Sequence, residues 1–162
     1  MKKFSAFFAG TLFLAVLLSL SAFKPVPPQG PSANGQGSLT VAGDQQRRFA
    51  FHANTMPDGS VQGSGELTYT GGELKIKFDI NCLKVSGSTA IISGIITSVA
   101  GPQAANFPDY VEGTLVVFKV IDNGEGENAS PDQISRLGQG SNCNSSSLPT
   151  FPIEGGNIQV KP

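Results

Sequence analysis

Apolar and polar residues alternate with a period of two over much of this chain. The clearest run covers residues 73–82, where the apolar positions are Leu74, Ile76, Phe78, Ile80 and Cys82. Polar residues occupy the positions between them, so this segment predicts a strand with one dry face and one wet face. After Cys82 the phase changes, because Leu83 and Val85 have the opposite parity, and this change predicts a β-bulge near Cys82.

Other segments predict further strands and the turns between them. The same alternation recurs over residues 49–53 and 67–69, whereas residues 90–99 and 111–121 are almost continuously apolar, as in strands covered on much of both faces. The only segment that could form a helical turn is 133–137. Glycine-containing turn sequences separate these runs at Pro57-Asp58-Gly59-Ser60, Gly71-Gly72, Ser86-Gly87-Ser88 and Gly155-Gly156.

This pattern predicts an all-β protein with a single antiparallel domain of about eight strands. Closure into a β-barrel is preferred, because a closed sheet has no free edge strands. Glycines within the predicted strands also favour a barrel, since a sheet bends at such positions; they are Gly63, Gly65, Gly94 and Gly113. The alternative is a two-sheet β-sandwich, in which the same glycines would mark local bulges.

The N-terminal region predicts export. Lys2 and Lys3 precede an apolar run with small residues at its end, so residues 1–22 are interpreted as a cleavable signal peptide. A permanent membrane anchor is the alternative interpretation of this run. Residues 23–37 are rich in Pro and Gly and predict a flexible linker. The all-β domain is then expected over residues 38–162, in a secreted or periplasmic protein.

The charge balance argues against some classes of partner. Loss of Lys2 and Lys3 with the signal peptide leaves 9 basic against 12 acidic residues, a net charge of −3. Such a chain has no general attraction for nucleic acid or anionic lipid. The adjacent pair Arg47-Arg48 is interpreted as part of a solvated strand edge. No membrane span is expected after cleavage of the signal peptide, and a partner is expected outside the cell or in the envelope.

The chain has two cysteines, Cys82 and Cys143, and they are expected to pair in an oxidising compartment. The disulfide would close a loop of about 60 residues and stabilise the fold by roughly 4 kcal/mol at most. Two separate buried thiols are the alternative. A zinc site is not indicated, because it would need more Cys or His ligands and His52 is the only histidine.

A polar segment over residues 122–132 carries candidate metal ligands. Calcium takes oxygen ligands from carboxylates, amides and backbone carbonyls, and exported proteins encounter this ion. The candidate calcium ligands are Asp122, Asn123, Glu125, Glu127 and Asp132. The alternative is a solvated loop in which these side chains bind their own backbone, as is common in loops rich in Asp and Asn. No other cofactor is expected.

Four segments of the domain follow one another in a recognisable order. They are DINCLKVSGSTAIISG at residues 79–94, FKVIDNGEG at 118–126, Cys143, and GGNIQV at 155–160. In this order they resemble the pattern of a family of small, uncharacterised exported bacterial all-β proteins. The resemblance implies an exported all-β domain with a cysteine in a strand, an acidic Asp-Asn-Gly loop and a C-terminal strand, and it implies no activity. The family's last strand often continues into a histidine, whereas this sequence continues with Lys161.

Candidate ligand-binding residues are few. Carbohydrate-binding modules often expose Trp or Tyr, but this chain has no Trp and two Tyr, which weakens that hypothesis. Tyr110, in a predicted loop, is the best single candidate for ligand contact. An apolar ligand could instead occupy the mouth of a barrel lined by aromatic rings. The candidate lining residues are Phe49, Phe51, Phe78 and Phe118, and packing of these rings against each other is the alternative.

No catalytic residue is predicted, and the protein is not expected to be an enzyme. A Ser-His-Asp hydrolase needs a histidine to transfer the proton, and His52 is expected on the wet face of its strand. The primary hypothesis is a non-enzymatic exported β-domain that serves as a binding or structural module of the cell envelope or exterior. The alternatives are a small apolar-ligand carrier of lipocalin-like shape, which would need a large open cavity, and a hydrolase, which would need carboxylates around His52.

Overall fold

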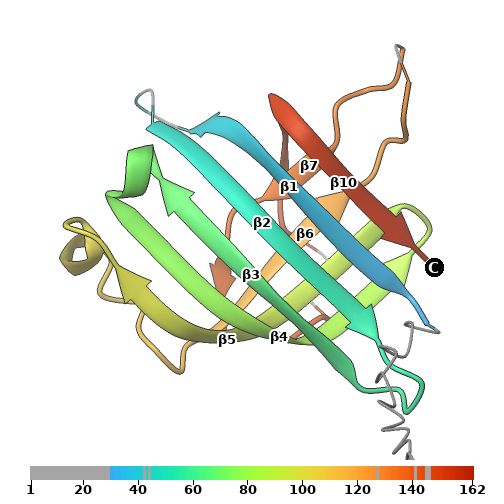
Figure 1. Cartoon of the computed structure of the whole chain (residues 1–162), viewed down its shortest axis with the longest axis horizontal. Coiled ribbons are helices and arrows are strands. Elements are labelled where there is room, and N and C mark those ends of the chain that lie inside the picture. Colours follow the sequence, from blue (N-terminus) through green and yellow to red (C-terminus); the bar gives the residue numbers. More distant parts are fainter. Residues whose placement is uncertain (1–29, 42, 44, 127, 141, 145–146) are drawn as a thin grey trace, which may run out of the picture.

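Ten antiparallel strands form one continuous sheet within the described part of the chain (Figure 1). The structure is a computed structural model, and it describes residues 30–41, 43, 45–126, 128–140, 142–144 and 147–162. The strands are β1 Ser32–Val41, β2 Gln45–Thr55, β3 Val61–Tyr69, β4 Leu74–Ser86, β5 Thr89–Ala100, β6 Leu115–Ile121, β7 Gln133–Ser135, β8 Gly138–Gln139, β9 Thr150–Pro152 and β10 Gly155–Lys161. Short 3₁₀ helices lie at Thr70–Gly72 and Ala104–Asn106.

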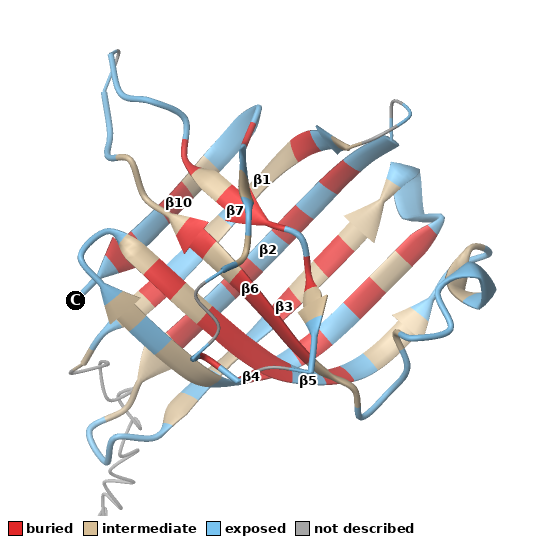
Figure 2. Ribbon diagram, turned by 180° about the vertical axis from the view of Figure 1, so that it is seen from behind, coloured by how far each residue is buried: buried red, intermediate tan, exposed pale blue. Residues whose placement is uncertain are grey.

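Most strands that are consecutive in the chain are also neighbours in the sheet. The order is β10-β1-β2-β3-β4-β5-β6-β7-β9, and β8 pairs with β6. The sheet curls so that β5 and β6 pass behind β1 to β4, and the core lies between these layers (Figures 1 and 2). The prediction of an all-β, antiparallel single domain is confirmed. The fold is not a two-sheet sandwich, because the ten described strands belong to one sheet, whose hydrogen-bonded order runs from β10 to β9.

The sheet forms a half-barrel instead of the closed barrel preferred from the sequence. Side chains bridge its seam, where β10 approaches the residues that flank β6 and β7. The Asp132 carboxylate, just before β7, accepts a hydrogen bond from the backbone N–H of Ile158 at 2.7 Å. The Asp122 carboxylate, directly after β6, accepts one from the N–H of Val160 at 2.9 Å. Both donors lie on β10, the end strand of the sheet. The two carboxylates therefore accept hydrogen bonds from backbone N–H groups on the edge of β10, which could otherwise pair with another chain.

The first strand begins earlier than the sequence predicts. Residues 32–37, assigned to the flexible linker, form the first half of β1 and pair with both β2 and β10. The linker prediction is therefore wrong for these residues, while the predicted signal peptide, residues 1–22, lies outside the described part of the chain. The physical reason is Gly35: a Cβ there would lie 2.9 Å from Cε1 of Phe51, whose ring fills the space. The Phe51 ring of β2 therefore fills the space that an apolar side chain at position 35 would otherwise occupy.

Other local predictions have mixed outcomes. The bulge near Cys82 is confirmed, because the register between β4 and β5 shifts between Ile80 and Cys82. The helical turn at 133–137 is wrong, since residues 133–135 form β7 by pairing with β6 and β9, a tertiary contact that overrides a weak local signal. Gly155 and Gly156 lie within β10 rather than in a turn before it.

The core is mostly apolar, and the buried polar residues of the described chain are Arg47, Ser93, Asp132 and Ser135. The four phenylalanines pack against each other, with ring centroids 5.2 Å apart for Phe51 and Phe118 and 5.7 Å apart for Phe78 and Phe118. The interpretation of Arg47-Arg48 as a solvated edge is wrong for Arg47, whose side chain is 0% exposed. Successive residues of a strand point to opposite faces, so the two arginines cannot both face solvent.

A disulfide joins Cys82 of β4 to Cys143, as predicted, with a sequence separation of 61. Cys143 is buried, and its Sγ lies 3.7 Å from the hydroxyl of Ser93 on β5. The bridge therefore fastens the segment after β8 across β4 and β5. Within the part of the chain that the structure describes, there is no helix of the length and apolarity that crossing a membrane requires.

Candidate functional site

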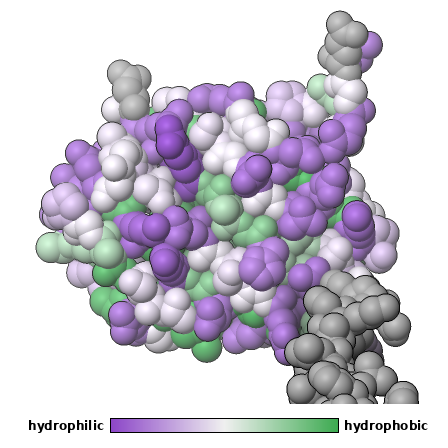
Figure 3. Space-filling model, viewed as in Figure 1, coloured by the Kyte–Doolittle hydropathy of each residue, from purple (hydrophilic) through white to green (hydrophobic). Residues whose placement is uncertain are grey.

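A broad hollow lies on the outer face of the sheet. It has a volume of about 650 Å³ and crosses six strands, β10, β1, β2, β3, β4 and β5. Figure 3 shows a pale centre surrounded by hydrophilic residues on this face. Its most distinctive side chains are four amides, from Asn34, Gln36, Asn157 and Gln159. We call this hollow the amide groove.

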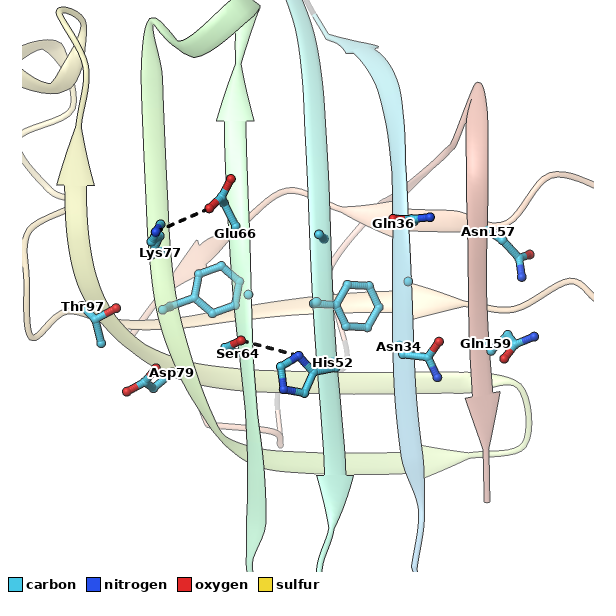
Figure 4. Close-up of a pocket in the computed structure, with 15 residues that line it drawn as sticks. Asn34, Gln36, His52, Ser64, Glu66, Lys77, Asp79, Thr97, Asn157 and Gln159 are labelled. Carbon is cyan, nitrogen blue, oxygen red and sulfur yellow. Dashed lines mark hydrogen bonds and ion pairs between the residues drawn. The ribbon is translucent and has the colours of Figure 1, made fainter. Parts of the chain in front are cut away.

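The strand register arranges the polar side chains of the groove in two rows (Figure 4). One row, which we call the histidine row, runs across Gln159, Asn34, His52, Ser64 and Asp79. The other row, the glutamate row, runs across Asn157, Gln36, Ala50, Glu66 and Lys77. Neighbouring strands are about 4.8 Å apart, so the four spacings between five strands give each row room for a ligand about 19 Å long.

The floor of the groove is made of small residues. Gly35, Ala50 and Gly65 line it, and the rings of Phe51 and Phe78 pack beneath the two glycines. Small residues leave the backbone and the edges of these rings close to the surface. The floor of the groove therefore carries no large side chain at these positions, and polar side chains lie on both sides.

The charges in the groove nearly cancel. Glu66 forms an ion pair with Lys75 at 2.8 Å and a longer one with Lys77 at 3.8 Å. All three side chains remain about 40% or more exposed, so these pairs contribute little to stability. Asp79 is the other carboxylate in the lining. The groove consequently offers hydrogen-bonding groups without a strong field of either sign.

His52 lies where the sequence predicts, on the exposed face of β2. Its Nδ1 is 3.5 Å from the hydroxyl of Ser64, a distance at the limit of hydrogen bonding. Asp79 lies on the far side of Ser64, two strands from His52 and so roughly 10 Å from it at the backbone. A Ser-His-Asp triad needs the histidine between the other two groups. Here the serine is in the middle, so Asp79 cannot orient the imidazole.

The four phenylalanines named as a ligand-lining set meet one another in the interior. Phe49, Phe51, Phe78 and Phe118 are each less than 10% exposed. The space left among them and their neighbours is about 10 Å³, close to the least that one water molecule needs. An apolar ligand of ordinary size needs several hundred cubic ångströms. The interior described here is thus filled by its own side chains.

Tyr110 takes a structural position in the loop between β5 and β6. Its hydroxyl donates a hydrogen bond to the carbonyl of Leu137 at 2.7 Å, and its ring lies near that of Phe107. Burial raises the pKa of Tyr110, and the neighbouring Tyr69 and Asp109 raise it further. The residue that the sequence favours for ligand contact therefore links two loops and lies outside the amide groove.

The candidate calcium ligands divide between the loop and the seam. Asp122 accepts a hydrogen bond from the N–H of Gly124, and Asp132 accepts one from the N–H of Asn123, both at 2.8 Å. The amide of Asn123 donates to the carbonyl of Pro131, and Glu125 accepts from the Asn157 amide. Glu127 lies outside the described residues, among which no group of three or more His, Cys, Asp or Glu is placed to hold a metal ion. Calcium binding stays a prediction from the sequence.

Comparison with known proteins connects this chain to none of them. No family model, curated protein or solved structure matches it. The resemblance noted from the sequence stays a prediction.

Sequence reasoning missed the amides of β1. Asn34 and Gln36 were assigned to the linker because they alternate with glycines instead of apolar residues. The period of two is nevertheless present, because one face of β1 carries Ala33, Gly35 and Gly37 and the other face carries the two amides. A rule that allows glycine on the dry face, wherever a neighbouring strand carries phenylalanine, would have found this strand.

Proposed function

We propose that this protein is an exported, non-enzymatic β-domain that acts as a binding module, and that it binds through the amide groove. The signal-like N-terminal sequence supports export, and the disulfide between Cys82 and Cys143 is compatible with an oxidising compartment. The observation that carries the binding role is the groove itself, with polar side chains in two rows across five strands.

The ligand class follows from the chemistry of the lining. Amides offer both donors and acceptors, and Asn34, Gln36 and Gln159 are exposed and project from adjacent strands. The near-cancellation of charge disfavours strongly charged ligands. A neutral, polyhydroxyl ligand such as an oligosaccharide fits these groups best, and an elongated one would follow the rows across the strands. Because no Trp or Tyr lines the groove, its binding would rest on hydrogen bonds and not on stacking of sugar rings.

A non-enzymatic role is supported by the arrangement of the titratable groups. Glu66 is neutralised by two lysines, and Asp79 is separated from His52 by Ser64. General acid–base chemistry needs a carboxylate or imidazole whose neighbours tune it for proton transfer. The groove offers recognition by hydrogen bonding, in which the sheet fixes the backbone position from which each side chain projects.

Binding of the mature protein to a printed array of neutral and acidic glycans tests this proposal. We expect binding to neutral oligosaccharides that changes little between about 0.05 and about 0.5 M salt, because salt does not screen hydrogen bonds between uncharged groups. The double variant Asn34→Ala with Gln159→Ala should bind about 30-fold more weakly, because it loses two hydrogen bonds worth about 1 kcal/mol each.

The matched control is Gln45→Ala, which removes an exposed amide of β2 outside the groove. This variant should bind as the wild-type protein does. Binding restricted to acidic glycans, binding abolished by salt, or equal losses in the double variant and the control would each overturn the proposal.

A further inference from the structure

A second hollow, away from the amide groove, lies between the end of β1 and the start of β2. It has a volume of about 120 Å³ and is lined by Leu39, Thr40, Val41, Arg47, Arg136 and Phe151. One water molecule needs at least about 10 to 15 Å³, so the hollow can hold a small molecule. We call it the arginine pocket, because two of its six lining residues are arginines.

Arg47 is buried with most of its hydrogen-bonding capacity unused. Its Nη2 donates to the carbonyl of Ser135 at 2.8 Å. Its Nε and Nη1, which carry three N–H groups, have no partner among the described residues. Arginine stays protonated in proteins, so this buried charge cannot be relieved by loss of a proton. Burying such a group without an acceptor is costly, and the site is short of acceptors.

The second arginine adds to the positive charge. Arg136 lies over the ring of Phe151, with its guanidinium carbon 5.7 Å from the ring centroid. Burial lowers the pKa of Arg47, the nearby Tyr69 partly offsets this effect, and the charge of Arg136 lowers the pKa further. The carboxylate of Glu154 bonds instead to the N–H and hydroxyl of Thr40 and does not line the pocket. Among the described residues, no carboxylate forms an ion pair with either guanidinium group.

The remaining lining is apolar. Leu39 and Val41 come from β1, and the aromatic ring of Phe151 comes from β9. The pocket thus joins a cationic side to an apolar side within a small volume. Guanidinium groups form strong paired hydrogen bonds with carboxylates, and an apolar group attached to the carboxylate would contact the other side.

We propose that the arginine pocket binds a carboxylate that carries a short apolar group. The exposed Arg136 contacts the carboxylate, and the charge of Arg47, whose side chain is 0% exposed, attracts it from the wall of the pocket. Such a carboxylate occurs both in free short-chain acids and at the end of a peptide. This inference is independent of the amide groove, which lies on the outer face of the sheet and shares no lining residue with the pocket.

Titration of the ¹⁵N-labelled mature protein with sodium butyrate, N-acetylvaline, acetate and sulfate, at constant ionic strength, tests the proposal. We expect saturable binding of a carboxylate, tighter for butyrate or N-acetylvaline than for acetate, with a shift of the Arg47 Nε–H resonance. Preference between the first two probes distinguishes a free acid from a peptide end. Tightest binding of sulfate, or saturation that leaves the Arg47 resonance unchanged, would overturn the proposal.

The variant Arg136→Gln is suited to the test, because Arg136 is exposed and its replacement should leave the fold intact. We expect it to bind butyrate about 10- to 150-fold more weakly, as loss of a charged hydrogen bond predicts. Arg48→Gln, an exposed arginine adjacent to Arg47 in the chain, is the matched control and should bind normally. Equal affinities of the two variants would contradict the assignment.

One further variant addresses a carboxylate within the chain itself. Asp44 lies outside the described residues, three positions before Arg47. Asp44→Asn should bind butyrate at least as tightly as the wild-type protein. If only Asp44→Asn binds, and the wild-type protein does not, the native chain fills its own pocket and the proposal is wrong.

Discussion

Removal of the Asp132 carboxylate should loosen the seam of the half-barrel. Asp132 is 6% exposed and accepts two backbone hydrogen bonds, from Ile158 at 2.7 Å and from Asn123 at 2.8 Å. Hydrogen bonds to charged groups contribute about 1.5–3 kcal/mol each, and a buried donor left without a partner costs about 1–3 kcal/mol. Ile158 is completely buried, so the variant Asp132→Ala leaves its N–H without water. We expect a loss of about 2–4 kcal/mol in the free energy of unfolding.

Urea unfolding of the protein at pH 7, followed by circular dichroism, measures this loss, and hydrogen exchange of the Ile158 amide locates it. The control is Asp109→Asn, an exposed carboxylate whose replacement should change stability by less than about 0.5 kcal/mol. Asp122→Ala, which removes the bond to Val160, should be destabilising as well. The two losses should not be additive, because both residues hold β10.

The reasoning would be refuted by a particular combination of results. If Asp132→Ala unfolds at the same urea concentration as Asp109→Asn, and the Ile158 amide keeps its protection from exchange, then the seam does not depend on these carboxylates. In that case the curvature of the sheet would have to be maintained by packing of the core alone.

Three other predictions concern the disulfide, the groove floor and pH. Replacing Cys82 and Cys143 by Ser opens a 61-residue loop and should lower the urea-unfolding free energy by up to about 4 kcal/mol; a loss below about 1 kcal/mol would contradict this expectation. Gly65→Ala places a methyl group against the Phe78 ring and should cost about 1–3 kcal/mol in the same assay, whereas an unchanged midpoint would show that the ring moves freely. Because burial raises the pKa of Tyr110, the folded state holds that proton more tightly than the unfolded chain; stability is retained below about pH 10 and lost as pH rises through the folded pKa, more so in wild type than in Tyr110→Phe. Parallel pH profiles of the two proteins would refute this last prediction.

The sequence by itself determined the strands in which apolar and polar residues alternate. The run from Leu74 to Cys82 and its bulge were predicted from parity alone, because a residue's side of the sheet depends only on its position in the strand. The same rule placed His52 on the exposed face. Pairing of the two cysteines followed from their number and from the predicted compartment.

Only the tertiary structure decided features that depend on a neighbour. Gly35 belongs to a strand because the Phe51 ring fills its space, and Gln133 begins a strand because β6 and β9 pair with it. The amide groove likewise exists only where six strands come into register, so residues 125 positions apart, Asn34 and Gln159, lie side by side. The physical reason is that periodicity records the two faces of each strand, whereas the identity of the adjacent strand depends on contacts distant in the chain.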